Sequence, residues 1–231
     1  MLIINNRLSI PYSTKAILWD MDGVLLDTLA LDIVLCNELI NKYIGENIKI
    51  SKNFIRSIFA HPPPKFWKLI FEHIKSEFNI IIRDNIYNEI LYEYNKCRNE
   101  SIFEVNPGIN DILTFCNKNN IKLAVVSNNP TEVVKRIIAQ SGIINYFDII
   151  VGNDFKNLKP KPSPDTYIYA AKLLKVNPED CVVVEDSLIG VEAGWHAKCF
   201  TVGVATGGDS FECLKKTQWA NIVYSSFGSR Q

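Results

Sequence analysis

Residues 16–24 read Ala-Ile-Leu-Trp-Asp-Met-Asp-Gly-Val, an apolar run that stops at two carboxylates and a glycine. A continuous apolar run of this length is typical of a strand that is buried on both faces of a parallel sheet. We therefore predict a buried parallel strand at residues 16–19. Similar β-rich apolar runs occur at residues 123–126, 149–151, 181–184, 200–202 and 222–224.

Helix signals separate these runs. Asn129 and Pro130 can serve as N-cap and first helical residue, and Gly142 can end the helix that follows. Ser163 and Ser187 can begin two further helices. The residues predicted to share one face of the helix after Ser187 are Leu188, Val191 and Trp195. Strands that alternate with helices predict an open α/β sheet with right-handed crossovers.

Residues 29–103 break this alternation, because they carry mainly helical patterns. The run His61-Pro62-Pro63-Pro64 interrupts them, since a proline run cannot continue a helix. Chain insertions are tolerated at exposed loops of a sheet edge. We predict a Rossmann-like α/β core formed by residues 1–28 and 104–231, with an inserted all-helical cap domain at residues 29–103. Within the core, residues 1–13 either add an edge strand or remain loose.

Composition excludes several classes of protein. The 231 residues include 25 Lys+Arg and 25 Asp+Glu, so no basic excess favours nucleic acid, and no basic amphipathic stretch favours a membrane surface. No apolar run approaches the roughly 18 residues of a spanning helix, and residues 1–15 lack the pattern of a secretory leader. The six cysteines form no Cys-x-x-Cys pair, which argues against zinc and for a reduced, cytoplasmic protein. The oligomeric state is not readable from the sequence.

The chemistry is expected at the carboxyl ends of the strands, where ligands bind in open α/β sheets. Taken singly, an acid before glycine is usually a turn residue, a serine after a strand is usually a cap, and a lysine in a proline-rich loop is usually solvated. Two acids before a helix can simply favour its dipole. Separate structural explanations for each group are hard to accept when four loops bring such groups to the same edge of the sheet. The candidates are Asp20, Asp22, Ser127, Asn128, Lys161, Glu185 and Asp186.

In this order, the four motifs resemble those of the haloacid dehalogenase superfamily, in its helical-cap phosphatase and β-phosphoglucomutase-like branch. Residues 20–24 match Asp-x-Asp-Gly-(Thr/Val), and Ser127 matches the Ser or Thr that ends a strand. Residues 161–164 match Lys-Pro-x-Pro, and residues 185–190 match Glu-Asp-Ser-x-x-Gly. Lys159 is a rival for the third motif, although the residues after Lys161 fit better. The resemblance runs from about residue 15 to the C-terminal region and includes the helical insertion.

The resemblance implies a phosphoric monoester hydrolase that uses Mg²⁺, a cation suited to carboxylates and substrate phosphate. Asp20 would bind the metal and attack phosphorus, which gives an aspartyl-phosphate. Asp22 would offer its backbone carbonyl to the metal, while its side chain protonates the leaving alkoxide and later takes a proton from water. Asp186 would be the main further metal acid, with Glu185 beside it.

The resemblance also assigns phosphate-binding groups. Ser127 and Asn128 would donate hydrogen bonds to phosphoryl oxygens, and Lys161 would offset negative charge in the transition state. The expected partner is a small phosphorylated metabolite, of the sugar phosphate or phosphoglycolate type. His61, in the loop that follows the first cap helices, is a candidate for contact with that substrate. The alternative for His61 is a surface histidine at a helix break.

Two alternatives to the phosphatase remain open. Dehalogenases of this kind lack the second aspartate, so Asp22 favours phosphate esters. A β-phosphoglucomutase-like sugar phosphomutase would have a histidine where Asp32 stands, and a phosphate-binding arginine at the position of Pro63 in a gapless comparison. The second alternative is a non-catalytic phospho-ligand-binding or regulatory protein, although the chain retains every group named above.

Overall fold

The computed structural model describes residues 1–155 and 158–228. Its main sheet has six parallel strands in the order β5-β4-β3-β6-β7-β8. The predicted α/β fold with a parallel sheet is confirmed, and each predicted apolar run coincides with a strand. The strands are β3 (Ala16–Trp19), β4 (Lys122–Val126), β5 (Ile149–Val151), β6 (Cys181–Glu185), β7 (Phe200–Val204) and β8 (Ile222–Tyr224).

Alternate residues of the central strand β3 face two different layers, because successive side chains of a strand point to opposite faces. Ile17 and Trp19 pack in one core with α5 (Ile109–Lys118) and α6 (Thr131–Gln140). Ala16 and Leu18 pack in the other. The helices of that second layer are α7 (Asp165–Leu174) and α8 (Leu188–His196).

The remaining elements of this part lie at its margins. An antiparallel hairpin, β1 (Leu2–Ile4) and β2 (Leu8–Ile10), occupies the N-terminal segment and packs in the same core as α5 and α6. The hairpin is therefore a separate two-stranded sheet and adds no edge strand to the main one. Helix α9 (Phe211–Lys216) lies against β7 and β8. Two short 3₁₀ helices are η1 (Ile144–Tyr146) and η2 (Pro178–Asp180).

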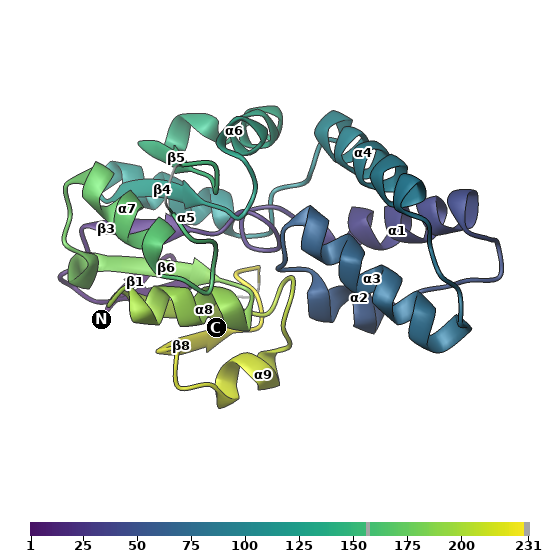
Figure 1. The fold of residues 1–231 in the computed structure, drawn as a ribbon. Coiled ribbons are helices and arrows are strands. Elements are labelled where there is room, and N and C mark those ends of the chain that lie inside the picture. Colours follow the sequence, from purple (N-terminus) through teal and green to yellow (C-terminus); the bar gives the residue numbers. More distant parts are fainter. Residues whose placement is uncertain (156–157, 229–231) are drawn as a thin grey trace.

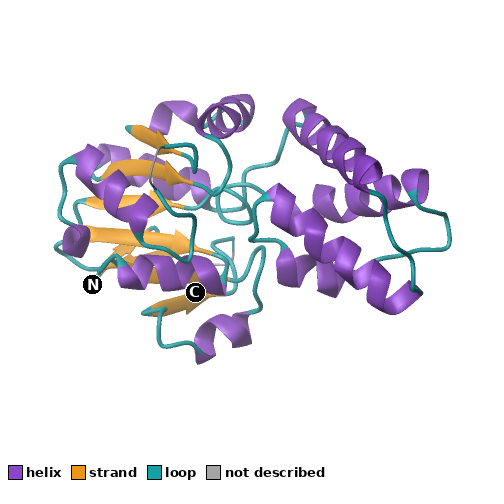
Figure 2. Cartoon of the chain, in the orientation of Figure 1, coloured by secondary structure: helices purple, strands orange, loops and turns teal. Residues whose placement is uncertain are grey.

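Four helices follow one another between β3 and α5 and lie apart from the sheet (Figures 1 and 2). We name them the cap. They share a hydrophobic core of their own, centred on the fully buried Trp67, Ile70 and Ile90. A separate core supports our proposal that residues 29–103 form a domain distinct from residues 1–28 and 104–231. The cap helices are α1 (Leu29–Tyr43), α2 (Lys52–Ile58), α3 (Pro63–Phe78) and α4 (Asp84–Glu100).

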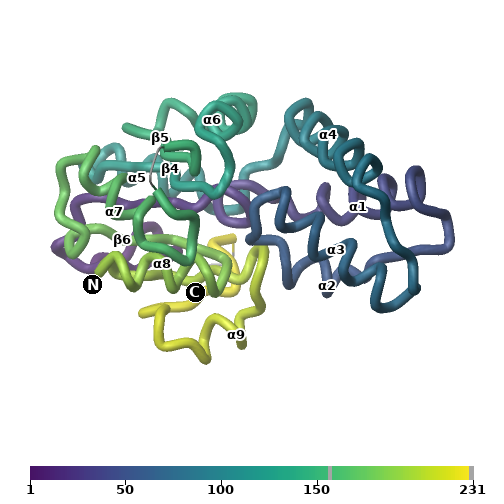
Figure 3. The backbone as a smooth tube through the Cα atoms, viewed as in Figure 1, coloured from purple at the N-terminus to yellow at the C-terminus, as the bar shows by residue number. Residues whose placement is uncertain are grey.

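The chain crosses between the sheet and the cap twice, along two neighbouring segments that Figure 3 shows in purple and teal. The backbone amide of Asp27 donates to the carbonyl of Glu104, and that of Asn106 donates to the carbonyl of Leu25. Asn106 also donates from its side chain to the carbonyl of Val24 at 2.9 Å. The two connections are therefore hydrogen-bonded to each other, and they position the cap opposite the carboxyl ends of the strands.

Some local predictions were wrong. Helix α6 begins at Thr131 and not at Pro130, because Asp154 accepts hydrogen bonds from the amide and hydroxyl of Thr131 and takes over the capping role. The predicted cap at Ser187 is confirmed, since its hydroxyl accepts from the amide of Gly190. Of the residues predicted to share one face of that helix, Val191 is buried, whereas Trp195 is 44% exposed. Among the described helices, none combines the length and the apolar character needed to cross a membrane.

Candidate active site

Lys161 lies at the centre of the carboxyl edge of the sheet. Its Nζ donates to Asp20 Oδ1 at 2.5 Å, to Glu185 Oε1 at 2.7 Å and to the carbonyl of Val126 at 2.9 Å. Burial alone would lower the pKa of Lys161, but the two carboxylates raise it above its usual value. The rival Lys159 is exposed. The lysine of the third motif is therefore brought to the acids of the first and the fourth.

Asp20, Glu185 and Asp186 form a buried cluster of carboxylates, whose ligand atoms all lie within 4.8 Å of one another. Burial is the main cause that raises the pKa of Asp20 and of Asp186 well above the usual range, and the charge of Glu185 raises both further. The single positive charge of Lys161 does not balance the negative charges of three buried carboxylates. A divalent cation would relieve this repulsion, and oxygen donors of this kind suit Mg²⁺.

The three acids differ in what their oxygens already bind. Glu185 Oε1 accepts from Lys161 and from the Tyr167 hydroxyl at 2.6 Å, and its Oε2 accepts from the amide of Asp186 and from Ser187. Within the described ranges, Asp20 Oδ2 and Asp186 Oδ1 accept no hydrogen bond. Asp20 and Asp186 thus have an oxygen free for a cation, whereas Glu185 is fully occupied as an acceptor.

Glycines allow the chain to pass close to these acids. Gly23 adopts a φ of 77°, in the left-handed region, and a Cβ at this position would collide with Asp186 Oδ2. A Cβ at Gly190 would collide in the same way with the carboxylate of Glu185. The glycines of the first and fourth motifs therefore make room for the carboxylates, which explains their places in the sequence.

Asp22 is held from two sides. Asn129 Nδ2 donates to Asp22 Oδ2 at 2.8 Å, and the guanidinium of Arg98 donates to Asp22 Oδ1. Arg98 comes from the last turn of α4 in the cap. Neither Asn129 nor Arg98 was among the predicted site residues. Asn129 adjoins Ser127 and Asn128 in the same loop, whereas Arg98 belongs to no motif and lies 76 positions from Asp22.

The loop after β4 brings the predicted phosphate-binding groups to the same cavity. The Ser127 hydroxyl accepts from the amide of Asn129 at 3.1 Å. Asn128 Oδ1 accepts from the amide of Lys161 at 3.1 Å, and its backbone carbonyl accepts from Asn153. Asn128 therefore links the loop that carries Lys161 to the loop that carries Ser127, and it also lines the cavity.

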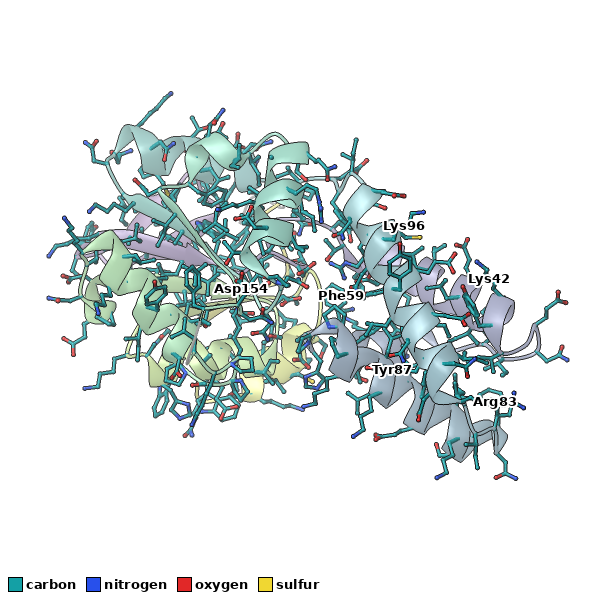
Figure 4. The ribbon with its side chains drawn as sticks, turned by 45° about the horizontal axis from the view of Figure 1, so that its top comes forward. Lys42, Phe59, Arg83, Tyr87, Lys96 and Asp154 are labelled. Atoms are coloured by element: carbon teal, nitrogen blue, oxygen red, sulfur yellow. The ribbon has the colours of Figure 1, made fainter. Side chains whose placement is uncertain are left out.

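The cap closes over these groups and leaves a cavity of about 40 Å³. His61 lines this cavity, and burial lowers its pKa below the usual value, so it is neutral near pH 7. Phe59, labelled in Figure 4, lies where the cap meets the sheet. The residues that the cap contributes to the lining are Phe59, Ala60, His61, Pro62, Pro63, Tyr94 and Arg98.

A second cap arginine reaches the loop that follows β7. Arg56 Nε donates to the carbonyl of Gly208 at 3.1 Å, and its NH2 donates to the carbonyl of Ala205 at 3.2 Å. The amide of Gly208 in turn donates to Asp186 Oδ2 at 2.5 Å. The cap is therefore linked by hydrogen bonds to the loop that orients one of the candidate metal acids.

A family model of haloacid dehalogenase-like hydrolases matches residues 14–198. The phosphorylated carbohydrates phosphatase of Thermotoga maritima is 30% identical over 186 residues, which cover 79% of this chain and 81% of that protein.

Two solved structures resemble the fold closely. The crystal structure of a predicted phosphoglycolate phosphatase from Haemophilus somnus has a TM-score of 0.81 at 20% identity, and the match covers 94% of this chain and 96% of that one. The β-phosphoglucomutase of Clostridium difficile has a TM-score of 0.74 at 27% identity, with 93% and 92% covered.

These findings agree with the order of the four motifs in the sequence. The predicted resemblance to the phosphatase and β-phosphoglucomutase-like branch is confirmed. The prediction of a phosphoric monoester hydrolase is confirmed as well. The chain belongs to the haloacid dehalogenase-like hydrolase family.

Proposed function

We propose that the chain is a Mg²⁺-dependent phosphatase that hydrolyses small phosphomonoesters, of the sugar phosphate or phosphoglycolate type, through an aspartyl-phosphate on Asp20. The observation that carries the proposal is the cluster of Asp20, Lys161, Glu185 and Asp186 beneath a closed cap. The Thermotoga relative, named for phosphorylated carbohydrates, supports the class of substrate.

Asp20, Asp186 and the backbone carbonyl of Asp22 would hold Mg²⁺, since the two carboxylates lie in one buried cluster and each has a free oxygen. The cation would neutralise phosphoryl charge and so let an anionic carboxylate approach phosphorus. Glu185 completes the acidic cluster and holds Lys161 with its Oε1. We assign to Lys161 the role of a fixed positive charge beside the nucleophile.

In the first step, a carboxylate oxygen of Asp20 attacks phosphorus, and the bond from phosphorus to the ester oxygen breaks. Asp22 gives its proton to the departing alkoxide. Ser127 and Asn128 would donate hydrogen bonds to the phosphoryl oxygens, where charge accumulates in the transition state. The products of this step are the free alcohol and Asp20 carrying the phosphoryl group.

In the second step, water attacks the same phosphorus atom and the bond to Asp20 breaks. Asp22 takes the proton of that water, so the carboxylate of Asp20 and the acid form of Asp22 are both restored. The hydrogen bonds from Asn129 and Arg98 fix the orientation of the Asp22 carboxylate for this exchange. The closed cap limits the access of other water during the reaction.

The mutase alternative is not favoured. A phosphomutase must bind a second phosphate, and the cap residue at the corresponding position is Pro63, which lines the cavity without a charge. The cap cation in the cavity, Arg98, is paired with Asp22 and Asp32. The similarity to the β-phosphoglucomutase of Clostridium difficile reflects the shared fold and cap.

We further propose a small phosphorylated metabolite as the partner of this site and the cytoplasm as its compartment. The convergence of core and cap residues on one cavity at the carboxyl edge of the sheet supports the first. The six cysteines, all of them free thiols, support the second.

The proposal is tested by phosphate release from a panel of small phosphomonoesters, measured with Mg²⁺ and with EDTA. Release that requires Mg²⁺ is the expected result. Isomerisation of a sugar phosphate without release would contradict it and favour a mutase. Binding of phospho-ligands with no turnover at saturating Mg²⁺ would instead indicate a non-catalytic protein.

A further inference from the structure

Among the described residues, Arg98 is the one cationic side chain that the cap contributes to the lining of the cavity. It therefore bears on the charge that a leaving group can carry. The other cap residues that line the cavity are neutral, since burial lowers the pKa of His61. Only 10% of the Arg98 side chain is exposed. A second anionic group on a substrate would therefore have to pair with this guanidinium.

The guanidinium is already neutralised by two carboxylates. Its NH1 donates to Asp32 Oδ2 at 2.6 Å, and its NH2 pairs with Asp22 Oδ1. Asp32, in the first turn of α1, is fully buried, and its other oxygen accepts from the Tyr94 hydroxyl at 2.8 Å. Two acids share one cation. When Asp22 carries the proton that it gives in the first step, Asp32 alone still neutralises the guanidinium, so Arg98 offers no unpaired positive charge.

The remaining cation of the cavity is not free either. Lys161 Nζ donates to Asp20, to Glu185 and to the carbonyl of Val126. Among the described residues that line the cavity, acidic side chains, Asp22 included, outnumber cationic ones by four to two. One bound Mg²⁺ would balance that excess of negative charge, and the transferred phosphoryl group would be the anion that the bound Mg²⁺ neutralises. No positive charge would remain for a second anionic group.

We propose that this site selects phosphomonoesters whose leaving group is uncharged, such as polyol or sugar monophosphates, and that Asp32 sets this selectivity by holding Arg98. The inference rests on the proposed phosphatase function and narrows its substrate class. It disfavours phosphoglycolate and sugar bisphosphates, because a carboxylate or second phosphate would lie beside Asp22 and meet an Arg98 that Asp32 already neutralises.

The first test uses the wild-type protein and a matched pair of substrates. Phosphoglycolate and 2-hydroxyethyl phosphate differ in that a carboxylate replaces a hydroxymethyl group. We expect kcat/KM to be at least about tenfold higher for 2-hydroxyethyl phosphate, because the carboxylate meets uncompensated negative charge. Equal or faster turnover of phosphoglycolate would overturn the inference and leave the phosphatase intact. No release from any monoester would overturn both.

The second test asks whether Asp32 is the determinant. In Asp32→Asn, Arg98 loses one of its two carboxylates and gains capacity for an anion. The ratio of kcat/KM for phosphoglycolate to that for 2-hydroxyethyl phosphate should rise about tenfold. A merely structural role would lower both values and leave the ratio unchanged, and that result would contradict the assignment.

A matched control is available on the same helix as Arg98. Glu93 on α4 pairs with Lys42 at 2.7 Å, and Figure 4 shows Lys42 on the cap away from the sheet. Glu93→Gln removes one cap carboxylate outside the cavity, so the ratio should stay at the wild-type value. A ratio that rose equally in Glu93→Gln would show that the overall charge of the cap, and not Asp32, sets the selectivity.

Discussion

Asp22 is bound by residues from both parts of the molecule, Asn129 from the core and Arg98 from the cap. In the proposed mechanism, Asp22 first gives and then takes a proton, which requires a fixed position and access to the substrate oxygen. The closed cap supplies one of its two hydrogen bonds through Arg98. Cap closure and the orientation of Asp22 are therefore coupled at the scale of a single carboxylate.

At the same scale, Ser127 should contribute through its hydroxyl to transition-state stabilisation. Ser127→Ala removes one donor to the phosphoryl group, so kcat should fall about 100-fold, as for the loss of one oxyanion donor. Steady-state phosphate release measures the effect. Ser76→Ala, an exposed serine on α3 that donates to the carbonyl of His73, is the control. A kcat for Ser127→Ala equal to that of the control would contradict the role.

Asp32 should leave a signature in the pH dependence of stability. Burial is the main cause that raises its pKa to about 6, whereas an unfolded aspartate titrates near 3.9. The folded state therefore holds this proton more tightly between these pH values. As pH rises through this window, the free energy of unfolding of the wild type should fall relative to Asp32→Asn, by roughly 2–3 kcal/mol.

Denaturant unfolding at intervals from pH 4 to pH 7, on both proteins, measures this difference. Other groups titrate in the same window, but they are common to the two proteins and cancel in the comparison. A difference that stays constant, or that moves in favour of the wild type as pH rises, would contradict a raised pKa for Asp32.

At the scale of elements, helix α2 is linked to the loop after β7 through Arg56. That loop orients Asp186 through the amide of Gly208. Such outer contacts fix the geometry of metal ligands, and their loss typically weakens metal binding. Cap closure should therefore tighten Mg²⁺ binding as well as cover the substrate.

Arg56→Met tests this link. The variant removes the hydrogen bonds to Gly208 and Ala205, so the Kd for Mg²⁺ should rise about tenfold, as measured by calorimetric titration. Arg83→Met changes an exposed arginine at the start of α4, labelled in Figure 4, and should leave the Kd unchanged. Equal affinities in the two variants would show that the cap does not act on Asp186.

The strands and the motif residues at their ends could be predicted from the sequence, because short apolar runs bounded by polar residues report burial directly. The Arg98–Asp22 pair could not be predicted, because the helical pattern around Tyr94 does not indicate how the cap packs against the core. The sequence predicts Asn129 as the N-cap of α6. In the structure Asp154, 23 residues from Thr131, accepts the hydrogen bond of the Thr131 amide instead, and no local sequence pattern indicates a cap from so far along the chain.

At the scale of the whole molecule, we expect the cluster of carboxylates to destabilise the protein when no cation is bound. Burial and mutual repulsion raise the pKa of Asp20 and Asp186, so the folded state gains when a cation binds. Mg²⁺ at about 100 times its Kd should stabilise the fold by about 2.7 kcal/mol. Thermal unfolding with Mg²⁺ and with EDTA measures the rise in Tm.

The rise in Tm should be reduced in Asp186→Asn, which removes one of the acids with a free oxygen. Each protein is compared with its own Tm in EDTA, so the comparison isolates the effect of the metal. An unchanged Tm of the wild type at saturating Mg²⁺ would contradict a metal site at this cluster.

We propose that Asp20 carries the phosphoryl group between the substrate and water. The most direct test is phosphate release by Asp20→Asn, at saturating Mg²⁺ and substrate, on protein shown to be folded by its thermal transition. An asparagine side chain of nearly equal size has only a neutral amide oxygen in place of the anionic carboxylate, so kcat should fall by at least about 10⁴-fold. Release by Asp20→Asn within about tenfold of the wild type would contradict the account.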